Sequence, residues 1–214
     1  MVMNTGMQFG DLHIKRHKGQ LPMSTEFVRC VNSVTARSFG QEVPLVETFE
    51  HLGESNLGHF VFNCRDQLIG YSLNNLFQTN VSGLDGARVN YFASAFVLPE
   101  ARRKLAIYKL LASTRLEHNE DFLMVRTQSP IVMSYFAWVC EIARMTLITP
   151  LDRVPTEVLS MVFESFSRNS LIHPKVYGRC LTKEPLEPKT SFTKDLMEGL
   201  HPEQGDALVL IGRK

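Results

Sequence analysis

One segment constrains this chain more than any other. An aromatic and valine-containing strand pattern over residues 89–98 stops at a proline and runs on into basic residues. Pro99 and Glu100 suit the first turn of a helix, because proline needs no N–H partner there and an acidic side chain favours the positive end of the helix. Apolar residues then recur with helical spacing over 106–114. The sequence therefore predicts a strand, a basic turn and a helix in direct succession.

This strand–turn–helix segment has the properties of a site for a pyrophosphate. Arg102, Arg103 and Lys104 carry full positive charges at the expected start of the helix. Backbone N–H groups at a helix start point outward, and the helix dipole adds partial positive charge. The alternative interpretation is a set of ordinary basic residues in the first turns of a surface helix.

The amino-acid composition and charge exclude several classes of protein. The 214 residues are 44% apolar, and 23 basic against 22 acidic residues give a formal charge of +1. This balance gives no general attraction to nucleic acid or to an anionic membrane. No apolar run is long enough for a membrane-spanning helix, and residues 1–20 lack the apolar stretch of a signal peptide. We therefore expect a soluble cytoplasmic protein.

Cysteine and histidine spacing gives no sign of a metal site. The four cysteines are too sparse for a stapled secreted domain, and no two form a CxxC pair, so we expect reduced thiols. Cys140 lies on an expected apolar helix face and is expected to be packed rather than reactive. His13 and His17 have an HxxxH spacing but no HExxH glutamate and no evident third ligand. We expect solvated histidines there and no metal.

The remaining pattern predicts alternating strands and helices. We expect strands over residues 8–14, 58–62, 67–73, 89–98, 121–127, 144–149, around 176–177 and over 207–211. We expect helices from a Ser24 N-cap to about Gly40 and over residues 44–51, 106–114, 130–141, 155–168 and 192–200. Residues 63–66 have the composition of a hairpin turn and residues 79–86 that of a loop.

The basic segment resembles the acyl-CoA loop of the GNAT superfamily, usually V-x-P-x-x-[QR]-x-x-G-x-[GA]. A match that begins at Arg103 puts Ala106 and Tyr108 at the two glycine positions, and a match one residue earlier puts Leu105 and Ile107 there. Either way the loop is poor in glycine, the residue that permits close approach of backbone to phosphate. The resemblance implies that residues 96–108 bind an acyl-CoA and that a glutamine later in the chain also contacts it. The implied binding residues are Phe96, Val97, Leu98, Arg102, Arg103, Lys104, Leu105, Ala106, Ile107, Tyr108 and Gln128.

Two further stretches follow the same family in the expected order. The return strand of the expected hairpin contains Leu68-Ile69-Gly70, similar to the apolar-apolar-glycine strand of GNAT proteins. After the strand over 121–127, Gln128 and Tyr135 have the spacing of seven found in the family pattern N-x-x-A-x-x-x-Y. Gln128 stands in place of the asparagine and Ile131 in place of the alanine.

The resemblance implies a catalytic role for Tyr135. In the family this tyrosine commonly protonates the leaving CoA thiolate, and a phenol is a suitable proton donor to a thiolate. The alternative is a core tyrosine on an apolar helix, beside Phe136 and Trp138. The residues fit both interpretations.

A general base is harder to assign. GNAT enzymes often use a carboxylate on the strand before the loop, or a chain of waters, but the strand over 89–98 contains no acid. Ser94 is the residue expected to position a water. Glu47, Glu50 and Glu54 lie in the segment that often shapes the acceptor site in this family, and solvated surface charge is the alternative. Arg126, a charge at the end of an apolar strand, indicates either anion binding or an internal ion pair.

These observations predict an α/β fold like that of GNAT proteins, with a mixed, mostly antiparallel sheet and helices on both faces. We expect one domain over 1–214, with a core over 7–149, an insertion or cap over 150–205 and a final strand over 206–212. The implied activity is transfer of an acyl group from acetyl-CoA or a longer acyl-CoA to a small-molecule or peptide amine. Two alternatives stay open: a long-chain N-acyl amino acid or autoinducer-type synthase, which also takes acyl carrier protein as donor, and a non-catalytic binding protein. We expect a monomer or homodimer that binds neither nucleic acid nor membrane.

Overall fold

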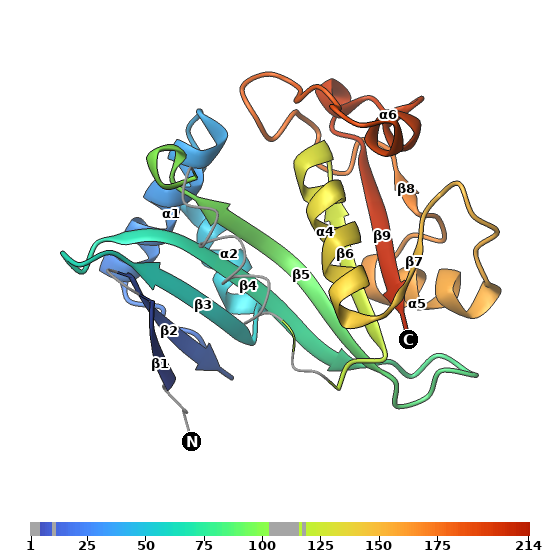
Figure 1. The fold of residues 1–214 in the computed structure, drawn as a ribbon, viewed down its shortest axis with the longest axis horizontal. Helices are drawn as coiled ribbons and strands as arrows, with labels where there is room; N and C mark the ends of the chain where they lie inside the picture. The colour runs from blue at the N-terminus through green and yellow to red at the C-terminus, as the bar shows by residue number, and fades with distance from the viewer. Residues whose placement is uncertain (1–4, 10–11, 103–115, 117–118) are drawn as a thin grey trace. The chain divides into compact units, whose positions relative to one another are not determined.

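The computed structural model describes residues 5–9, 12–102, 116 and 119–214, and Figure 1 follows them from blue to red. The strands are β1 Thr5–Phe9, β2 Leu12–Lys18, β3 Leu57–Phe62, β4 Leu68–Gln78, β5 Arg88–Val97, β6 Phe122–Thr127, β7 Thr146–Ile148, β8 Ile172–His173 and β9 Ala207–Arg213. The helices are α1 Thr25–Phe39, α2 Leu45–Glu54, α4 Pro130–Ala143, α5 Thr156–Phe166 and α6 Ser191–Met197, with short 3-10 helices η1 Pro99–Ala101 and η2 Pro202–Gln204.

The strands follow the order β1-β2-β3-β4-β5-β6-β9-β7 in the sheet, and β8 pairs with β9. The pairs β1–β2, β2–β3, β3–β4, β6–β9, β7–β9 and β8–β9 are antiparallel. The chain divides into two compact units. Unit 1 comprises Met1–Leu76 with Phe92–Glu117, and unit 2 comprises Phe77–Tyr91 with His118–Lys214. The expected division into core, insertion and final strand stays a prediction.

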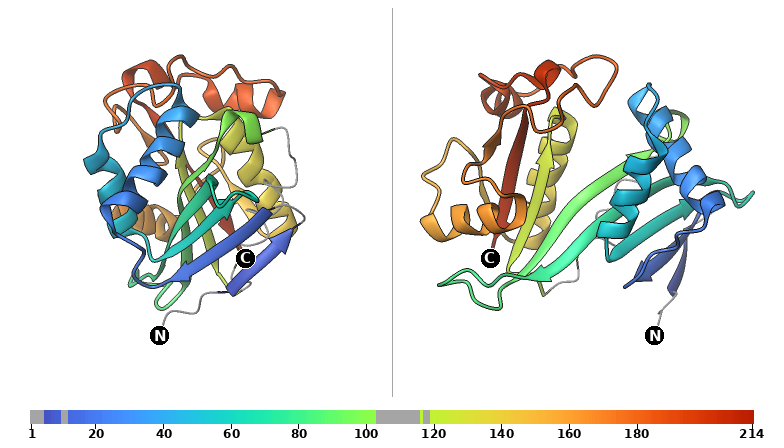
Figure 2. Two further views of the ribbon diagram at one scale, coloured as in Figure 1. Left: turned by 90° about the vertical axis from the view of Figure 1, so that its left-hand side faces the viewer. Right: turned by 180° about the vertical axis from the view of Figure 1, so that it is seen from behind.

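Unit 1 packs α1 and α2 against one face of its strands (Figure 2). Helix α1 begins where Ser24 accepts a hydrogen bond from the Phe27 N–H, and it ends at Gly40, which has a φ of 72°. Both caps satisfy backbone groups that have no partner inside the helix. The buried face of α1 packs in one core cluster with residues of α2, of η1, of the strands and of the connecting segments. The cluster comprises Leu12, Ile14, Leu21, Val28, Val31, Val34, Leu52, Phe60, Val61, Ile69, Tyr71, Leu73, Val97, Leu98 and Ala101.

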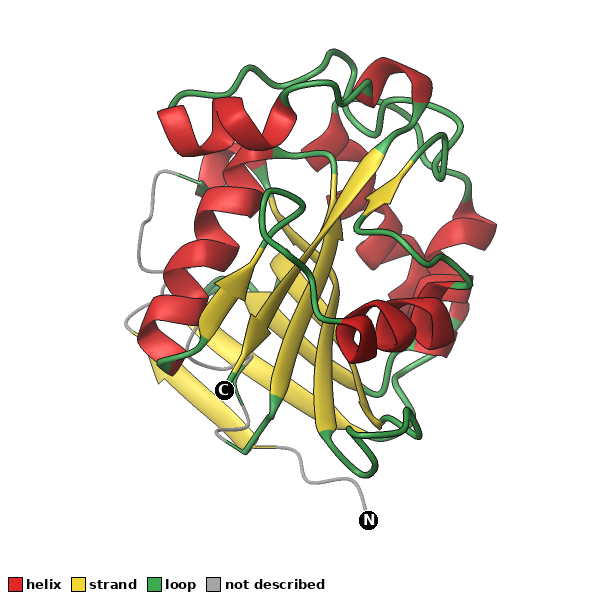
Figure 3. Ribbon diagram, turned by 90° about the vertical axis from the view of Figure 1, so that its right-hand side faces the viewer, coloured by secondary structure: helices red, strands yellow, loops and turns green. Residues whose placement is uncertain are grey.

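Unit 2 has helices on both faces of β6 and β9, as Figure 3 shows. Side chains of a strand alternate between the two faces. Met124 and Ile211, which pair across the sheet, pack in one cluster with Val158 and Met161 of α5. Gly212 is on the other face, and its backbone lies against Cys140 of α4. The expected covering of both sheet faces is therefore observed within this unit.

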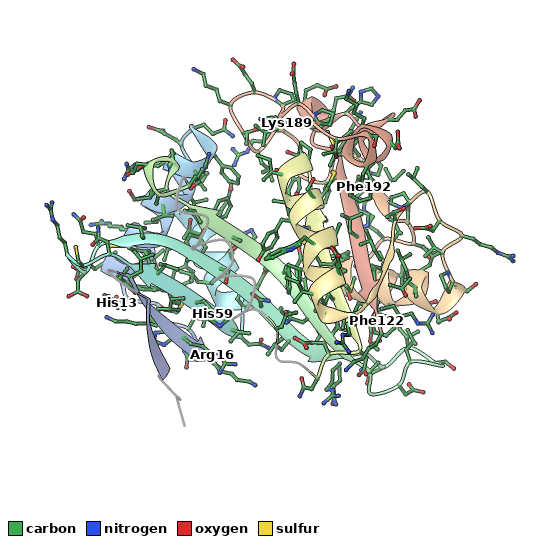
Figure 4. All side chains as sticks on the ribbon, in the orientation of Figure 1. His13, Arg16, His59, Phe122, Lys189 and Phe192 are labelled. Atoms are coloured by element: carbon green, nitrogen blue, oxygen red, sulfur yellow. The ribbon has the colours of Figure 1, made fainter. Side chains whose placement is uncertain are left out.

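The segment between β7 and β9 is held by the pairing of β8 with β9 and by hydrogen bonds within the segment. The Tyr177 N–H donates to the Gly205 carbonyl, 3.1 Å away, and Asp206 accepts from the Lys175 N–H at 2.8 Å. Gly205 has a φ of 93°, and a Cβ there would lie 2.4 Å from the Gly178 nitrogen. Helix α6 begins with a capping box between Thr190 and Thr193. Lys189 and Phe192, labelled in Figure 4, flank that helix start.

Three expected elements differ from the structure. The strand expected over 8–14 is two antiparallel strands, with Phe9 opposite Leu12. The strand expected around Val176-Tyr177 is wrong, because β8 lies earlier, at Ile172–His173. The return strand of the hairpin extends beyond residue 73 to Gln78. The helix expected over 106–114 lies outside the described residues.

Among the residues that the structure describes, no helix is both long and apolar enough to cross a membrane.

Candidate functional site

The end of β5 is fixed by hydrogen bonds from two neighbouring elements. The Leu98 N–H donates to the Ile69 carbonyl of β4 at 2.9 Å. The Val97 carbonyl accepts two bonds, from the Ser38 hydroxyl at 3.2 Å and from Nε of Arg102 at 3.1 Å. Both lone pairs of that carbonyl are therefore used inside unit 1.

Gly70 lets β4 approach this strand end closely. A Cβ on Gly70 would lie 3.0 Å from the Phe96 carbonyl oxygen and 3.3 Å from a Val97 methyl group. The glycine of the Leu68-Ile69-Gly70 motif thus has a packing role beside residues 96 and 97.

The turn after β5 carries charges that face α1. Pro99 opens the 3-10 helix η1, as expected for a proline at a helix start. Glu100 accepts a hydrogen bond from Arg37, with 2.6 Å between Nη2 and the carboxylate oxygen. The pKa of Glu100 is lowered by a hydrogen bond from its own backbone and by Arg37. Arg102 also turns toward α1, where its Nη2 donates to the Ser38 carbonyl at 2.8 Å. Residues Arg103, Lys104, Leu105, Ala106, Ile107 and Tyr108 lie outside the described residues.

Ser94 belongs to a chain of hydroxyl groups. The Thr35 hydroxyl donates to the Val31 carbonyl at 3.0 Å, so its oxygen accepts from the Tyr71 phenol, 2.5 Å away. The Ser94 hydroxyl in turn hydrogen-bonds to the Tyr71 oxygen. Tyr71 is buried, and this burial raises its pKa above the ordinary value, so the phenol stays neutral. Ser94 is thereby oriented by a buried tyrosine that sequence reasoning did not single out.

Phe96 packs into an aromatic cluster of unit 1. Its ring centroid lies 4.8 Å from that of Phe39 and 5.5 Å from that of Tyr71. Phe60 continues the cluster, 6.4 Å from Tyr71. These contacts favour core packing for the Phe96 ring, and a cofactor contact by residues 96–98 stays a prediction.

In unit 2, Tyr135 lies on α4, whose start is well defined. Ser129 caps the helix by accepting from the Val132 N–H, and Pro130 occupies the first turn. The Tyr135 side chain is half-buried, and its ring centroid lies 6.0 Å from that of the partly exposed Trp138. Neighbouring Phe136 faces the core. The Tyr135 hydroxyl oxygen is itself buried, and a contact of this residue with a ligand stays a prediction.

Gln128 is buried and holds the segment that follows α5. Its Nε2 donates to the carbonyls of Arg179 and Pro202, at 3.1 and 3.3 Å. Its Oε1 accepts from the Leu181 N–H at 2.9 Å. Both amide hydrogens are engaged in these bonds. A cofactor contact by Gln128 stays a prediction, and the observed contacts are structural.

Arg126 lies between two aromatic rings. Its guanidinium carbon is 4.9 Å from the ring centroid of Phe166 and 5.3 Å from that of Tyr177. Cation–π contacts of this kind involve arginine more often than lysine. Its Nε also lies 3.4 Å from the Tyr177 hydroxyl oxygen. Arg126 therefore helps to hold the residue 177 region against β6.

Among the described residues, no three His, Cys, Asp or Glu side chains are grouped to hold a metal ion. Glu47, Glu50 and Glu54 all lie on α2, and the last two are exposed. His13 and His17 lie on β2 rather than on a helix.

Comparison with known proteins gives matches at the level of structure alone. No family model matches the sequence, and no curated protein matches it. The ribosomal-protein-S18-alanine N-acetyltransferase of Escherichia coli matches with a TM-score of 0.51 at 9% identity, over 94% of this chain and 92% of that chain. A GCN5-related glucosamine N-acetyltransferase region of a fungal multi-domain beta-N-acetylglucosaminidase matches with a TM-score of 0.49 at 11% identity, over 76% and 21%. The Escherichia coli GNAT N-acetyltransferase YhbS, solved with CoA, has a TM-score of 0.41 at 16% identity, over 63% and 68%.

The chain has the fold of GNAT N-acetyltransferases. The predicted fold class and the resemblance on which it rests are confirmed at the level of the fold.

Proposed function

We propose that this protein is an N-acyltransferase that takes its acyl group from acetyl-CoA or a longer acyl-CoA and passes it to an amine. The observation that carries the proposal is the fold match along nearly the whole of both chains with an enzyme whose name describes alanine N-acetylation. The sequence match of residues 97–108 to an acyl-CoA loop supports the same activity.

The reaction needs few groups from the protein. The amine nitrogen forms a bond to the acyl carbon and loses one proton to solvent, the carbon–sulfur bond breaks, and the thiolate takes up a proton from a donor that solvent then reprotonates. In our proposal Tyr135 donates that proton. The Val97 carbonyl is already occupied, and backbone groups alternate in direction along a strand. Since the Leu98 N–H points to β4, the Val97 N–H points to the other side of β5, where it suits an oxyanion.

Ser94 is the proposed group beside the attacking amine. Its oxygen is buried beside Tyr71, and in our proposal it accepts a hydrogen bond from a water or an amine N–H that enters with the acceptor. A hydroxyl held in this way positions a nucleophile but is too weak a base to deprotonate an ammonium, so the amine must enter neutral.

One observation favours a non-catalytic variant of this function. Strand β5 has no carboxylate, and Ser94 is its only proposed polar group near residue 96. A protein that binds acyl-CoA without turnover would have the same charges and the same fold. The long-chain alternative would use aromatic rings of β5 to line an acyl-chain tunnel. Phe92 is buried and Phe96 packs against Phe39, which favours core packing for both rings.

Titration calorimetry with CoA, acetyl-CoA, octanoyl-CoA and an acyl carrier protein tests the proposal. A second arm measures thiol release from the preferred donor across a panel of amines and N-terminal peptides. Donor binding with amine-dependent thiol release supports an enzyme, and binding without release indicates the non-catalytic variant. Failure of every donor to bind would refute the proposal.

A further inference from the structure

Arg102 joins the end of α1 to the end of β5. Its Nε donates to the Val97 carbonyl at 3.1 Å, and its Nη2 donates to the Ser38 carbonyl at 2.8 Å. Ser38 closes the arrangement, because its hydroxyl donates to the same Val97 carbonyl at 3.2 Å. Three hydrogen bonds therefore link a helix end, a strand end and the first basic residue of the expected loop. We call Arg102, Ser38 and Val97 the β5 clasp.

The β5 clasp supplies a hydrogen-bond donor to a carbonyl at the C-terminal end of α1. The last carbonyls of a helix have no intrahelical partner, and the helix dipole makes this end negative. The Gly40 N–H satisfies the Ala36 carbonyl at 2.9 Å, and Arg102 satisfies that of Ser38. A guanidinium suits the task because its donors are fixed in a planar fork that reaches two carbonyls at once. The Arg37–Glu100 ion pair also links α1 to the turn after β5, with 2.6 Å between the Arg37 Nη2 and the Glu100 carboxylate oxygen.

We propose that Arg102 is a positioning residue for acyl-CoA binding and not a ligand of the phosphates. The inference rests on the proposed function. The Nε–H and one Nη2–H of Arg102 are directed at protein carbonyls, so the side chain is turned toward α1. By holding the Val97 carbonyl, Arg102 keeps that carbonyl from a ligand and fixes the end of β5. Direct phosphate contact is then the task of the basic residues that follow in the sequence.

A charge-conserving substitution separates the two roles. Lysine is a good phosphate ligand but lacks the fork that reaches both carbonyls. If Arg102 acts through the clasp, Arg102→Lys and Arg102→Gln weaken CoA binding to a similar extent. Ser38→Ala removes one clasp bond without changing any charge, so it also weakens CoA binding. Arg65→Gln, in the exposed β3–β4 turn, is the matched control for loss of one positive charge.

The experiment titrates each full-length variant with CoA by calorimetry. We expect both Arg102 variants to raise the Kd about tenfold, Ser38→Ala to raise it about threefold and Arg65→Gln to leave it unchanged. Wild-type affinity in Arg102→Lys beside a loss in Arg102→Gln would make Arg102 a phosphate ligand and overturn the proposal. Unchanged affinity in both Arg102 variants would also overturn it.

Amide hydrogen exchange without CoA keeps this inference separate from the proposed function. The Gly40 and Leu98 amides are hydrogen-bonded on either side of the clasp. We expect Arg102→Gln and Ser38→Ala to speed their exchange, while amides of β9 exchange as in the wild type. If the wild type binds no CoA, the proposed function fails and the exchange data alone decide on the clasp. Unchanged exchange at residues 40 and 98 would show that Arg102 fixes nothing there.

Discussion

The sulfur of Cys140 lies 2.6 Å from the point that a Cβ atom on Gly212 would occupy. Helix α4 therefore rests directly on the β9 backbone. Gly212→Ala forces α4 or the sheet to move, since Leu123 and Met145 also lie within 3.5 Å of that point. We expect the free energy of unfolding to fall by about 1–3 kcal/mol, the usual cost of overpacking. Urea unfolding measures it.

The double variant Gly212→Ala/Cys140→Ala is the matched control. Removing the sulfur relieves the clash, so the two changes together should cost less than the sum of the single changes. Strictly additive effects would mean that α4 does not approach β9 as described. Cys140 itself should resist thiol reagents in the native state, because burial raises its pKa to about 12.

A second prediction concerns the three hydrogen bonds of Gln128. Gln128→Leu keeps most of the volume but leaves the carbonyls of Arg179 and Pro202 and the Leu181 N–H without this partner. A buried group that loses its partner costs about 1–3 kcal/mol. We expect faster hydrogen exchange and faster proteolysis over residues 175–190, with β6 protected as before. Unchanged exchange at residue 181 would contradict this account of the segment.

Local signals in the sequence were enough to predict most elements. The Ser24 and Gly40 caps of α1 are read from residue type, because each cap satisfies backbone groups within its own turn. Strand pairing is different. β8 has two residues and exists through its pairing with Leu208 and Ala207, far along the chain, so no local pattern marks it. The sequence predicts one strand where β1 and β2 pair, because the residue types of these two strands do not reveal their register.

The candidate site was predicted less completely than the fold. Residue type and order placed Ser94 and Arg102 near the end of β5, but sequence reasoning could not show which way their side chains turn. The Tyr71–Thr35 bond that orients Ser94 joins a strand to a helix 36 positions away in the sequence. Nothing in the sequence distinguishes Ser38 from another polar residue near a helix end. Such side-chain contacts depend on tertiary packing, so no spacing pattern in the sequence predicts them.

A third prediction concerns acid stability through His173. This side chain is fully buried, and its Nε2 donates to the Ser170 carbonyl at 2.8 Å. Burial and then the nearby Arg126 charge lower its pKa from 6.5 to about 4. The unfolded chain therefore binds a proton below pH 6.5 that the folded chain takes up only near pH 4, so stability is lost as the pH falls through this window.

The test compares urea unfolding at pH 7 and pH 5. The shift corresponds to a loss of about 2 kcal/mol from this group between the two values. His173→Gln has no titrating ring, so its stability should change less over the same interval. A variant with the full wild-type pH dependence would show that another group is responsible.

A fourth prediction concerns Arg103, which follows the β5 clasp in the sequence. If the segment binds the pyrophosphate, Arg103→Glu replaces attraction by repulsion. A charge-assisted hydrogen bond to phosphate is worth about 1.5–3 kcal/mol, so the Kd for CoA should rise tenfold or more. The effect should shrink at high salt, because exposed charges are screened. Equal CoA affinity in the variant and the wild type, with the fold intact by circular dichroism, would argue against this segment as the site.

The last prediction concerns the proton for the leaving thiolate. Tyr135 follows the β6–α4 junction by one and a half helical turns, and its side chain is half-buried beside Trp138. If its phenol donates the proton, Tyr135→Phe slows the chemical step and leaves donor binding nearly unchanged. General acid catalysis contributes about 10²–10⁴-fold, and a thiolate leaves readily even without help, so we expect a loss near 10²-fold.

Single-turnover acyl transfer, to the amine that performs best in the acceptor screen, measures this loss beside the Kd for CoA. Tyr177→Phe is the matched control, since it removes a phenol that contacts Arg126 in the same unit. The pH profile separates the two roles of Tyr135: loss of a general acid removes the fall in rate at high pH, whereas loss of a packing contact lowers the rate equally at every pH. Wild-type turnover by Tyr135→Phe would make Tyr135 a packing residue. A lower free energy of unfolding with an unchanged pH profile would lead to the same conclusion, because the hydroxyl would then act within the fold and not on the thiolate.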